Sequence, residues 1–397
     1  LADVDSSNFA GGNLTVTIAS GEDSAEDVLS LSTSGTVALA SASANANVSV
    51  GGTVVGTLAN AIAAGNDLVV NLNSAATAAS VQTLVRAITY QNIDTDNPTA
   101  GARVVRTTIN DGDGGTSANA DVTVTVAAVN DVPTIANLGS DSFTFTEGAA
   151  ATVIDQSTAA VLADVDSSNF AGGNLTVTIT SGEDSAEDVL SLSTSGTVAL
   201  ASTSSGANVS VGNTVVGTLA NAIAAGNDLV VNLNSAATAA NVQTLVRAIT
   251  YQNTDTDNPT TGDRVVRVTV NDGDGGTSAT STVTVTVTSV NDPPALGSLD
   301  GGSVAYTEGD GAVSMDADAT VTDDDSADFN TGTLTVTIAS GGDAAEDVLS
   351  IENEGTGGGQ IGVSGSNVSY GGTVIGTFAG GSSGNALVVT LDSDATP

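Results

Sequence analysis

Residues 282–289 read TVTVTVTS, a strict alternation of threonine and valine. Successive side chains of a β-strand point to opposite faces, so Val283, Val285 and Val287 are expected to point inward and the threonines toward water. The segment NLTVTI, residues 174–179, alternates in the same way, with Leu175 and Ile179 on its apolar face. This pattern predicts antiparallel strands with one buried and one solvated face.

Shorter strands separated by Gly, Ser and Asn turns are predicted around these two, at residues 142–146, 189–193, 197–201, 209–211, 214–219, 228–232 and 264–271. Only residues 239–249 have helical spacing, with Val242, Leu245, Val246 and Ile249 on one face and Thr238 as N-cap. Many short strands with one small helix predict an all-β sandwich.

A long internal repeat organises the chain. Residues 1–131 recur almost letter for letter as residues 162–292, and a looser third copy begins at Thr322. Proline-containing stretches at residues 128–133 and 289–294 are expected linkers. We therefore predict three units: 1–131, lacking its N-terminal strand; 132–292, complete; and 293–397, lacking its C-terminal strands. The chain is expected to be an excerpt of a longer protein.

The composition excludes several kinds of chemistry. The chain has 45 acidic residues and only six basic residues, all of them arginine, so its net charge is −39. This charge disfavours nucleic acid and anionic membranes as partners. Without Cys or His the chain has no disulfide, no thiolate or imidazole metal site and no His-based catalysis. No apolar run reaches the ~18 residues of a membrane span. Calcium held by carboxylates is the main remaining means of stiffening an extracellular rod.

Five acidic clusters recur in phase with the repeat. Calcium prefers six to eight oxygen ligands from flexible loops, which closely spaced carboxylates beside glycines can provide. DTDN precedes Pro98 and Pro259 and suits a simple turn, and GEDSAED (21–27 and 182–188) suits a solvated loop. The clusters are DxD at residues 3–5, 164–166 and 323–325; TEG at 146–148 and 307–309; NDGDGG at 110–115 and 271–276; ND at 130–131 and 291–292; and DTDN at 94–97 and 255–258.

Three of these motifs carry a family resemblance. ADVDSSNFAGGNLTVTI resembles the cadherin pattern in which a DxD turn, Gly and Asn precede a strand. VRVTVNDGDGGTSATSTVTVTVTSVNDPP resembles the cadherin ending, and TEG the Glu that closes a cadherin first strand. The chain thus resembles the bacterial cadherin-like tandem repeats of giant secreted adhesins. The resemblance implies Ig-like sandwiches joined end to end as a rod, and it covers the start and end of each unit.

The resemblance also implies Ca²⁺ at the unit junctions. Ala128 and Ser289 stand where the family usually has an Asp before ND, so each junction is expected to hold fewer ions or to recruit GEDSAED. The implied ligands are Asn130, Asp131, Asp164, Asp166 and Asp272 at the first junction; Glu147, Asn291, Asp292, Asp323 and Asp325 at the second; Asp3, Asp5 and Asp111 at a junction before the chain; and Glu308 at one after it.

These observations favour a non-catalytic, calcium-stiffened region of a large bacterial surface adhesin or filament, located outside the cell. Its partners would be neighbouring repeats and copies of itself, packed laterally through Thr282, Thr284, Thr286 and Thr288. The alternative is a glycan-binding module, which needs aromatic platforms. A glycosidase with paired carboxylates is disfavoured by the tandem repetition. The available tyrosines are Tyr90, Tyr251, Tyr306 and Tyr370, of which the first two are expected in the core.

Overall fold

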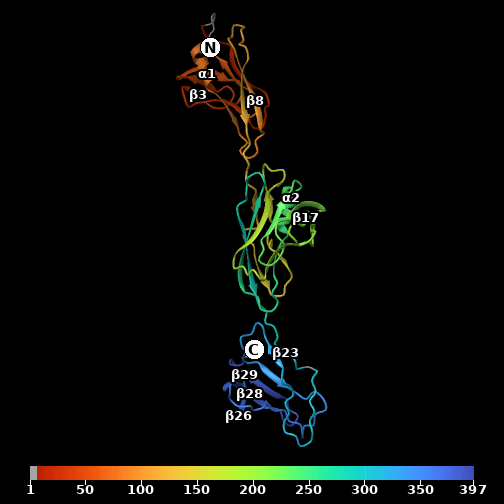
Figure 1. The fold of residues 1–397 in the computed structure, drawn as a ribbon. Helices are drawn as coiled ribbons and strands as arrows, with labels where there is room; N and C mark the ends of the chain where they lie inside the picture. Colours follow the sequence, from red (N-terminus) through yellow and green to blue (C-terminus); the bar gives the residue numbers. More distant parts are fainter. Residues whose placement is uncertain (1–6, 300) are drawn as a thin grey trace.

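The computed structural model describes residues 7–299 and 301–397, so the proposed ligands Asp3 and Asp5 lie outside the described residues. The described chain is all-β apart from two short helices. Figure 1 shows three lobes that follow one another along the molecule. We call them the first lobe (7–126), the second lobe (134–288) and the third lobe (295–397).

The second lobe is built around an eight-stranded sheet of order β11-β22-β21-β14-β19-β18-β17-β16. A three-stranded sheet, β12-β20-β15, and a two-stranded sheet, β10-β13, complete it. The elements are β10 (Thr134–Ala136), β11 (Ser142–Thr146), β12 (Thr152–Val153), β13 (Val161–Ala163), β14 (Asn174–Ser181), β15 (Asp188–Leu192), β16 (Val198–Leu200), β17 (Asn208–Val211), β18 (Thr214–Leu219), β19 (Leu229–Leu233), α2 (Ala239–Arg247), β20 (Ile249–Asn253), β21 (Gly262–Asn271) and β22 (Ser281–Thr288).

The predicted elements of this lobe are present, with ends that differ by a residue or two. Strands β11 and β18 have the predicted bounds. Helix α2 begins after the predicted N-cap, where the Thr238 side chain accepts a hydrogen bond from the Asn241 amide. It ends at Arg247, and Ile249 begins a strand, β20, that was not predicted. The sheet is also not wholly antiparallel, because β11 pairs in parallel with β22.

The core of the second lobe follows the alternation in β22. Val283, Val285 and Val287 are at most 1% exposed. On the other face Thr282 is exposed and Thr284, Thr286 and Thr288 are half-buried, so the threonine face is only partly solvated. Their hydroxyls are partly used within the lobe: Thr286 donates to Asp263 Oδ1 (2.6 Å). Strand β22 lies between β11 and β21 and is not an edge strand.

The first lobe repeats this architecture with a seven-stranded sheet of order β3-β4-β5-β6-β1-β8-β9 and a β2-β7 pair. Leu14 faces Val70 here as Leu175 faces Val231 in the second lobe. The elements are β1 (Asn13–Ser20), β2 (Asp27–Leu31), β3 (Val37–Leu39), β4 (Asn47–Val50), β5 (Thr53–Leu58), β6 (Leu68–Leu72), α1 (Ala78–Arg86), β7 (Ile88–Asn92), β8 (Gly101–Asn110) and β9 (Ala120–Val126).

The first and second lobes differ at the sheet edge that β11 occupies in the second lobe. Among residues 7–126 no strand pairs with the outer side of β9, the counterpart of β22. Val122 is therefore 64% exposed, whereas its counterpart Val283 is fully buried. A groove of about 470 Å³ runs beside β9 and reaches Tyr90 and Val105. In the second lobe, Phe145 of β11 covers the equivalent position.

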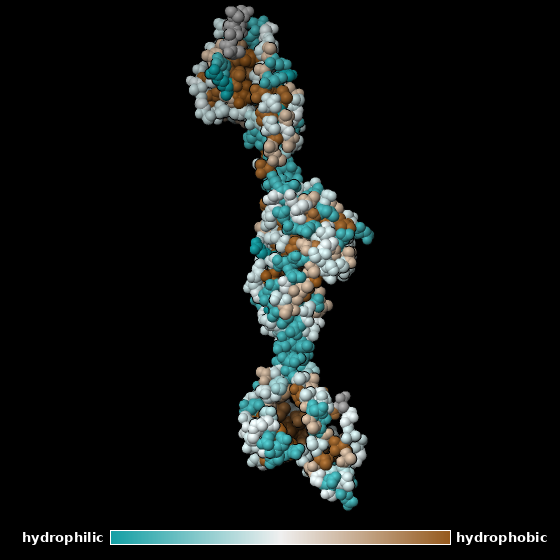
Figure 2. Space-filling view, in the orientation of Figure 1, coloured by the Kyte–Doolittle hydropathy of each residue, from teal (hydrophilic) through white to brown (hydrophobic). Residues whose placement is uncertain are grey.

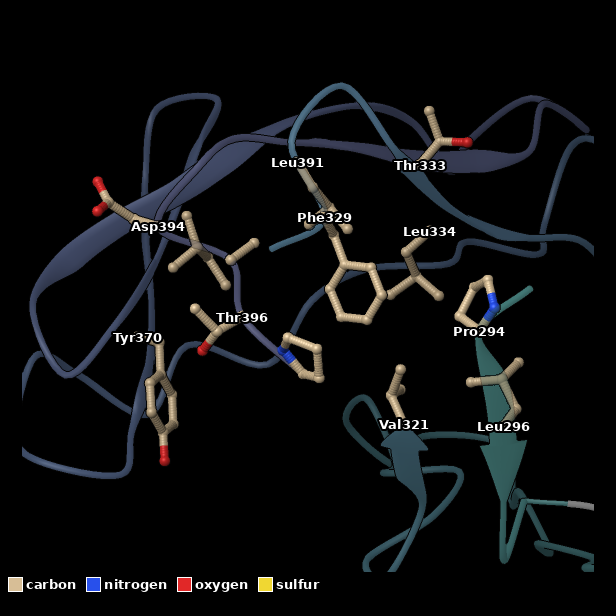
Figure 3. A pocket seen from close by; sticks show the side chains of 13 residues that line it. Pro294, Leu296, Val321, Phe329, Thr333, Leu334, Tyr370, Leu391, Asp394 and Thr396 are labelled. Carbon is tan, nitrogen blue, oxygen red and sulfur yellow. The ribbon is translucent and has the colours of Figure 1, made fainter. Parts of the chain in front are cut away.

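The third lobe has a five-stranded sheet of order β25-β29-β28-β27-β26 and a β23-β24 pair. Its apolar side is open, and Figure 2 shows a hollow lined by hydrophobic residues in this lobe. In the pocket of about 520 Å³ drawn in Figure 3, Phe329 and Leu334 face Val321 and Pro294. The strands are β23 (Ala295–Gly297), β24 (Thr320–Thr322), β25 (Thr333–Val336), β26 (Ile361–Ser364), β27 (Asn367–Tyr370), β28 (Thr373–Gly380) and β29 (Leu387–Leu391).

Candidate metal centres at the lobe junctions

The first junction brings together the five ligands predicted for it. Asn130 and Asp131 lie in the linker after β9, and the acidic turn 164–166 follows β13. The Asp131 amide donates to Asp166 Oδ2 (2.9 Å), and Asn130 Nδ2 donates to Asp272 Oδ2 (2.9 Å). Linker and acidic turn are thus tied to the NDGDGG loop of the second lobe.

Asp272 is the best-held carboxylate of this junction. It is fully buried, and its Oδ1 accepts hydrogen bonds from the backbone amides of Asp274, Gly275 and Gly276 at 2.8–3.0 Å. Burial raises the pKa of Asp272, but the hydrogen bonds from Asn130 and these amides outweigh it and lower the pKa overall. Gly276 is required here, since a Cβ would lie 2.1 Å from Asp272 Oδ2. Asp272 therefore stays ionised.

The acidic turn of the first junction contains oxygens that the protein does not satisfy. Asp164 Oδ2, Asp166 Oδ1 and Ser167 Oγ are buried and have no hydrogen-bond partner. Burial raises the pKa of the Asp164 carboxyl, and the neighbouring Asp166 adds to the rise. Buried polar atoms are rarely left unpaired, because their lost hydration is not replaced. A cation bound by these oxygens would replace it.

The second junction repeats the arrangement. The Asp292 amide donates to Asp325 Oδ2 (3.0 Å), and the Ser326 amide donates to Asp323 Oδ1 (3.0 Å). Glu147, at the end of β11, accepts a hydrogen bond from the Val290 amide (2.7 Å) through Oε2. Glu147 thereby lies beside the linker, 143 residues away in sequence. The buried oxygens without a partner are Glu147 Oε1, Asp292 Oδ2 and Asp325 Oδ1.

Three predicted ligands remain among the described residues, of which only Asn291 was assigned to one of these two junctions; Asp111 was assigned to a junction before the chain and Glu308 to one after it. Asp111 accepts hydrogen bonds from the Asp113 and Gly115 amides of its own loop, and Glu308 is exposed. Asn291 is exposed and donates to the Asp292 carbonyl (2.7 Å). Within residues 7–299 and 301–397, no three Asp or Glu side chains lie close enough together, as placed, to hold a metal ion. The unpaired oxygens are thus the observation that fits a cation.

The interpretation of GEDSAED as a solvated loop is wrong for its last residue. Asp188 is 1% exposed, and its Oδ2 accepts a hydrogen bond from Arg264 Nε (2.9 Å). The Tyr251 hydroxyl donates to the other oxygen (2.5 Å). Asp27, Arg103 and Tyr90 form the same network in the first lobe. Nothing in the spacing of these residues indicated the pairing.

The two tyrosines of this network differ in burial, since Tyr251 lies in the core and Tyr90 also lines the groove beside β9. Tyr251 is fully buried and packs edge-on against Phe145, with ring centroids 5.3 Å apart and an interplanar angle of 86°. Tyr90 is half-buried beside the equivalent core. Of the four tyrosines, only Tyr306 and Tyr370 are exposed, which leaves little for an aromatic glycan platform.

The DTDN loops also reach the junctions, although the sequence favoured a simple turn. Asp94 Oδ1 accepts hydrogen bonds from the Asp96 and Asn97 amides, as expected for a turn. Asn97 Nδ2, however, donates to the Val165 carbonyl of the second lobe (3.1 Å). The recurrence of DTDN in phase with the other clusters was the only sequence signal for this contact.

Comparisons with known proteins do not assign a family. No family model matches the chain, and no curated protein matches it. Among solved structures, the chain is similar to the crystal structure of collagen adhesin (CNA) from S. aureus, at 12% identity. The match covers 70% of this chain and 88% of that chain, with a TM-score of 0.15. A likeness this remote carries no argument about function. No helix in the described ranges is long and apolar enough to cross a membrane.

Proposed function

We propose that this chain is a non-catalytic, calcium-stiffened repeat region of a large secreted bacterial surface adhesin or extracellular filament. In this proposal each unit is a cadherin-like sandwich of about 161 residues, and the units join end to end as a rod. Calcium bound between units fixes the angle at each linker.

The observation that carries the proposal is the set of unpaired buried oxygens at both junctions. Asp166 at the first junction and Asp325 at the second share one pattern. In each carboxylate one oxygen accepts a hydrogen bond from the linker amide and the other has no hydrogen-bond partner. Carboxylate oxygens are the ligands that Ca²⁺ prefers. Their recurrence at equivalent positions supports one shared role.

The charge balance supports the same role. The 45 acidic residues far exceed the six arginines, so protein cations cannot neutralise the junctions. At the first junction Asn130, Asp131, Asp164, Asp166 and Asp272 would hold the ion, and at the second Glu147, Asp292, Asp323 and Asp325. A bound divalent cation supplies the positive charge that offsets repulsion between these carboxylates. Without it, the linkers act as hinges.

Calcium titration by calorimetry tests this proposal on the whole chain. We expect the unmodified chain to bind calcium at both junctions. The double variant Asp164→Ala/Asp166→Ala should lose the first junction's binding and leave the second nearly intact, since sites a full lobe apart behave independently. Asp323→Ala/Asp325→Ala is the matched variant for the second junction. Equal loss at both junctions in either variant would contradict the ligand assignment.

A further inference from the structure

A hydrogen bond crosses each junction between a DTDN loop and the next lobe. Asn97 Nδ2 donates to the Val165 carbonyl (3.1 Å), and Asn258 Nδ2 donates to the Asp324 carbonyl (2.8 Å). Val165 and Asp324 are the middle residues of the acidic turns 164–166 and 323–325. Equivalent residues thus make the same contact twice, between lobes that are otherwise joined by a short linker.

The loop that carries each asparagine is tied to the core of its own lobe. In the second lobe, Asn253 Nδ2 donates to the buried Asp188 carboxylate (3.3 Å) and to Glu187 (2.9 Å). Asn253 Oδ1 accepts from the Asp255 amide (3.0 Å). Asp255 Oδ1 in turn accepts from the Asn258 amide (3.1 Å). The second lobe therefore holds the Asn258 backbone through a continuous path from its buried ion pair.

The first lobe contains the same path. Asn92 Nδ2 donates to Asp27 (3.3 Å) and to Glu26 (3.0 Å), and its Oδ1 accepts from the Asp94 amide (2.9 Å). Asp94 Oδ1 accepts from the Asn97 amide (3.1 Å). The repetition of every step indicates that the loop is built to present the asparagine side chain at the junction.

One hydrogen bond of this kind contributes little to the free energy on its own. Asn97 and Asn258 are also exposed, so the bond cannot hold two lobes together against repelling carboxylates. Its effect is orientation, because it fixes the backbone carbonyl between the two carboxylates of the acidic turn. Groups that orient metal ligands from outside typically change metal affinity by roughly 10–100-fold.

We propose that Asn97 and Asn258 are positioning residues that aim the acidic turn of the following lobe at the junction calcium site. This inference rests on the proposed calcium function. Each asparagine acts on its own junction and not on the other. The junction site is then shared by both lobes: one supplies carboxylates, and the other sets their direction.

Spin-label distances across each junction test the proposal. The chain has no cysteine of its own, so introduced cysteines are the only sites of labelling. The pair Ala38→Cys/Ala199→Cys places one spin label on each side of the first junction, and the pair Ala199→Cys/Ser364→Cys does the same at the second. Calcium is titrated, and the midpoint at which each distance distribution narrows is recorded. Asn258→Ala should raise the midpoint at the second junction by roughly tenfold and leave the first unchanged. Asn97→Ala should do the reverse.

Asn221→Ala is the matched control, because Asn221 Nδ2 donates to a backbone carbonyl within the second lobe, that of Asp228 (3.2 Å). It should move neither midpoint. Thermal unfolding of Asn97→Ala and Asn258→Ala should match that of the unmodified chain, which separates positioning from a fold defect. A control that moves the midpoints as much as Asn258→Ala would overturn the inference.

The two proposals fail in different ways. Calcium midpoints unchanged in both asparagine variants, with normal binding by the unmodified chain, would overturn the positioning role and leave calcium stiffening intact. No narrowing by calcium in the unmodified chain would overturn the calcium function, and with it the inference that Asn97 and Asn258 serve a metal site.

Discussion

Arg264 and Arg103 each lie buried beside one aspartate in a chain with very few cations. The side chains of Arg264 and Asp188 are 1% and 0% exposed, whereas those of Arg106 and Asp121 are 38% and 41% exposed. The sequence identified all of these residues as charged but could not pair them, because Arg264 and Asp188 lie 76 residues apart. Which charges are buried depends on tertiary packing.

Removing one partner of the buried pair should be costly. Arg264→Ala leaves the buried Asp188 carboxyl without its ion-pair partner in the core, which should reduce the free energy of unfolding by about 3–5 kcal/mol. The matched change Arg106→Ala, at the exposed pair, should cost far less, because water and salt screen that pair. Denaturant unfolding followed by circular dichroism measures both. Similar losses in the two variants would show that burial does not set the value of these pairs.

The Asp27 carboxyl should make the first lobe sensitive to acid. Burial raises the pKa of Asp27, but hydrogen bonds from Tyr90, the Asp23 amide and Arg103 outweigh it and lower the pKa below its usual 3.8. Its stabilising effect is therefore present above the unfolded-state pKa and lost as the pH falls through the lower, folded-state pKa. The stability difference between the unmodified chain and Asp27→Asn should shrink over that acidic range. A difference independent of pH would contradict this.

At the scale of elements, alternation predicted most strands of the second lobe but missed the short strands β10, β12 and β13, and also β20 (Ile249–Asn253). Four of the five residues of β20 are buried, and β20 lies between β12 and β15, so no polar face marks it as a strand. The helix was predicted to include Ile249 because that residue continues the apolar spacing. The turn of chain at Ala248 could not be read from spacing alone.

Strand β11 should be a principal stabiliser of the second lobe. Phe145 is 1% exposed and packs on Tyr251, so Phe145→Ala should cost about 3–5 kcal/mol in free energy of unfolding. Phe143, on the same strand, is only half-buried, so Phe143→Ala should cost clearly less. Chemical denaturation of the two variants compares them directly. A greater loss in Phe143→Ala would place the main anchor of β11 elsewhere.

For the whole molecule, the sequence predicted the junction residues better than their arrangement. The phased motifs located the linkers, Asp272 and the acidic turns, because motifs at strand ends meet where lobes meet. The cross-junction hydrogen bonds of Asn97 and Asn258 could not be predicted, since they depend on how each loop is held by a buried network. The threonine surface expected for lateral packing is half-covered within the second lobe.

The central claim is that calcium stiffens the junctions, and small-angle X-ray scattering of the whole chain tests it most directly. In calcium, the three lobes should form an extended particle with a sharply defined maximum dimension. In chelator, repulsion between Asp131, Asp166 and their counterparts should turn the linkers into hinges and give a shorter, more flexible particle. The same maximum dimension and flexibility in both buffers would contradict the account.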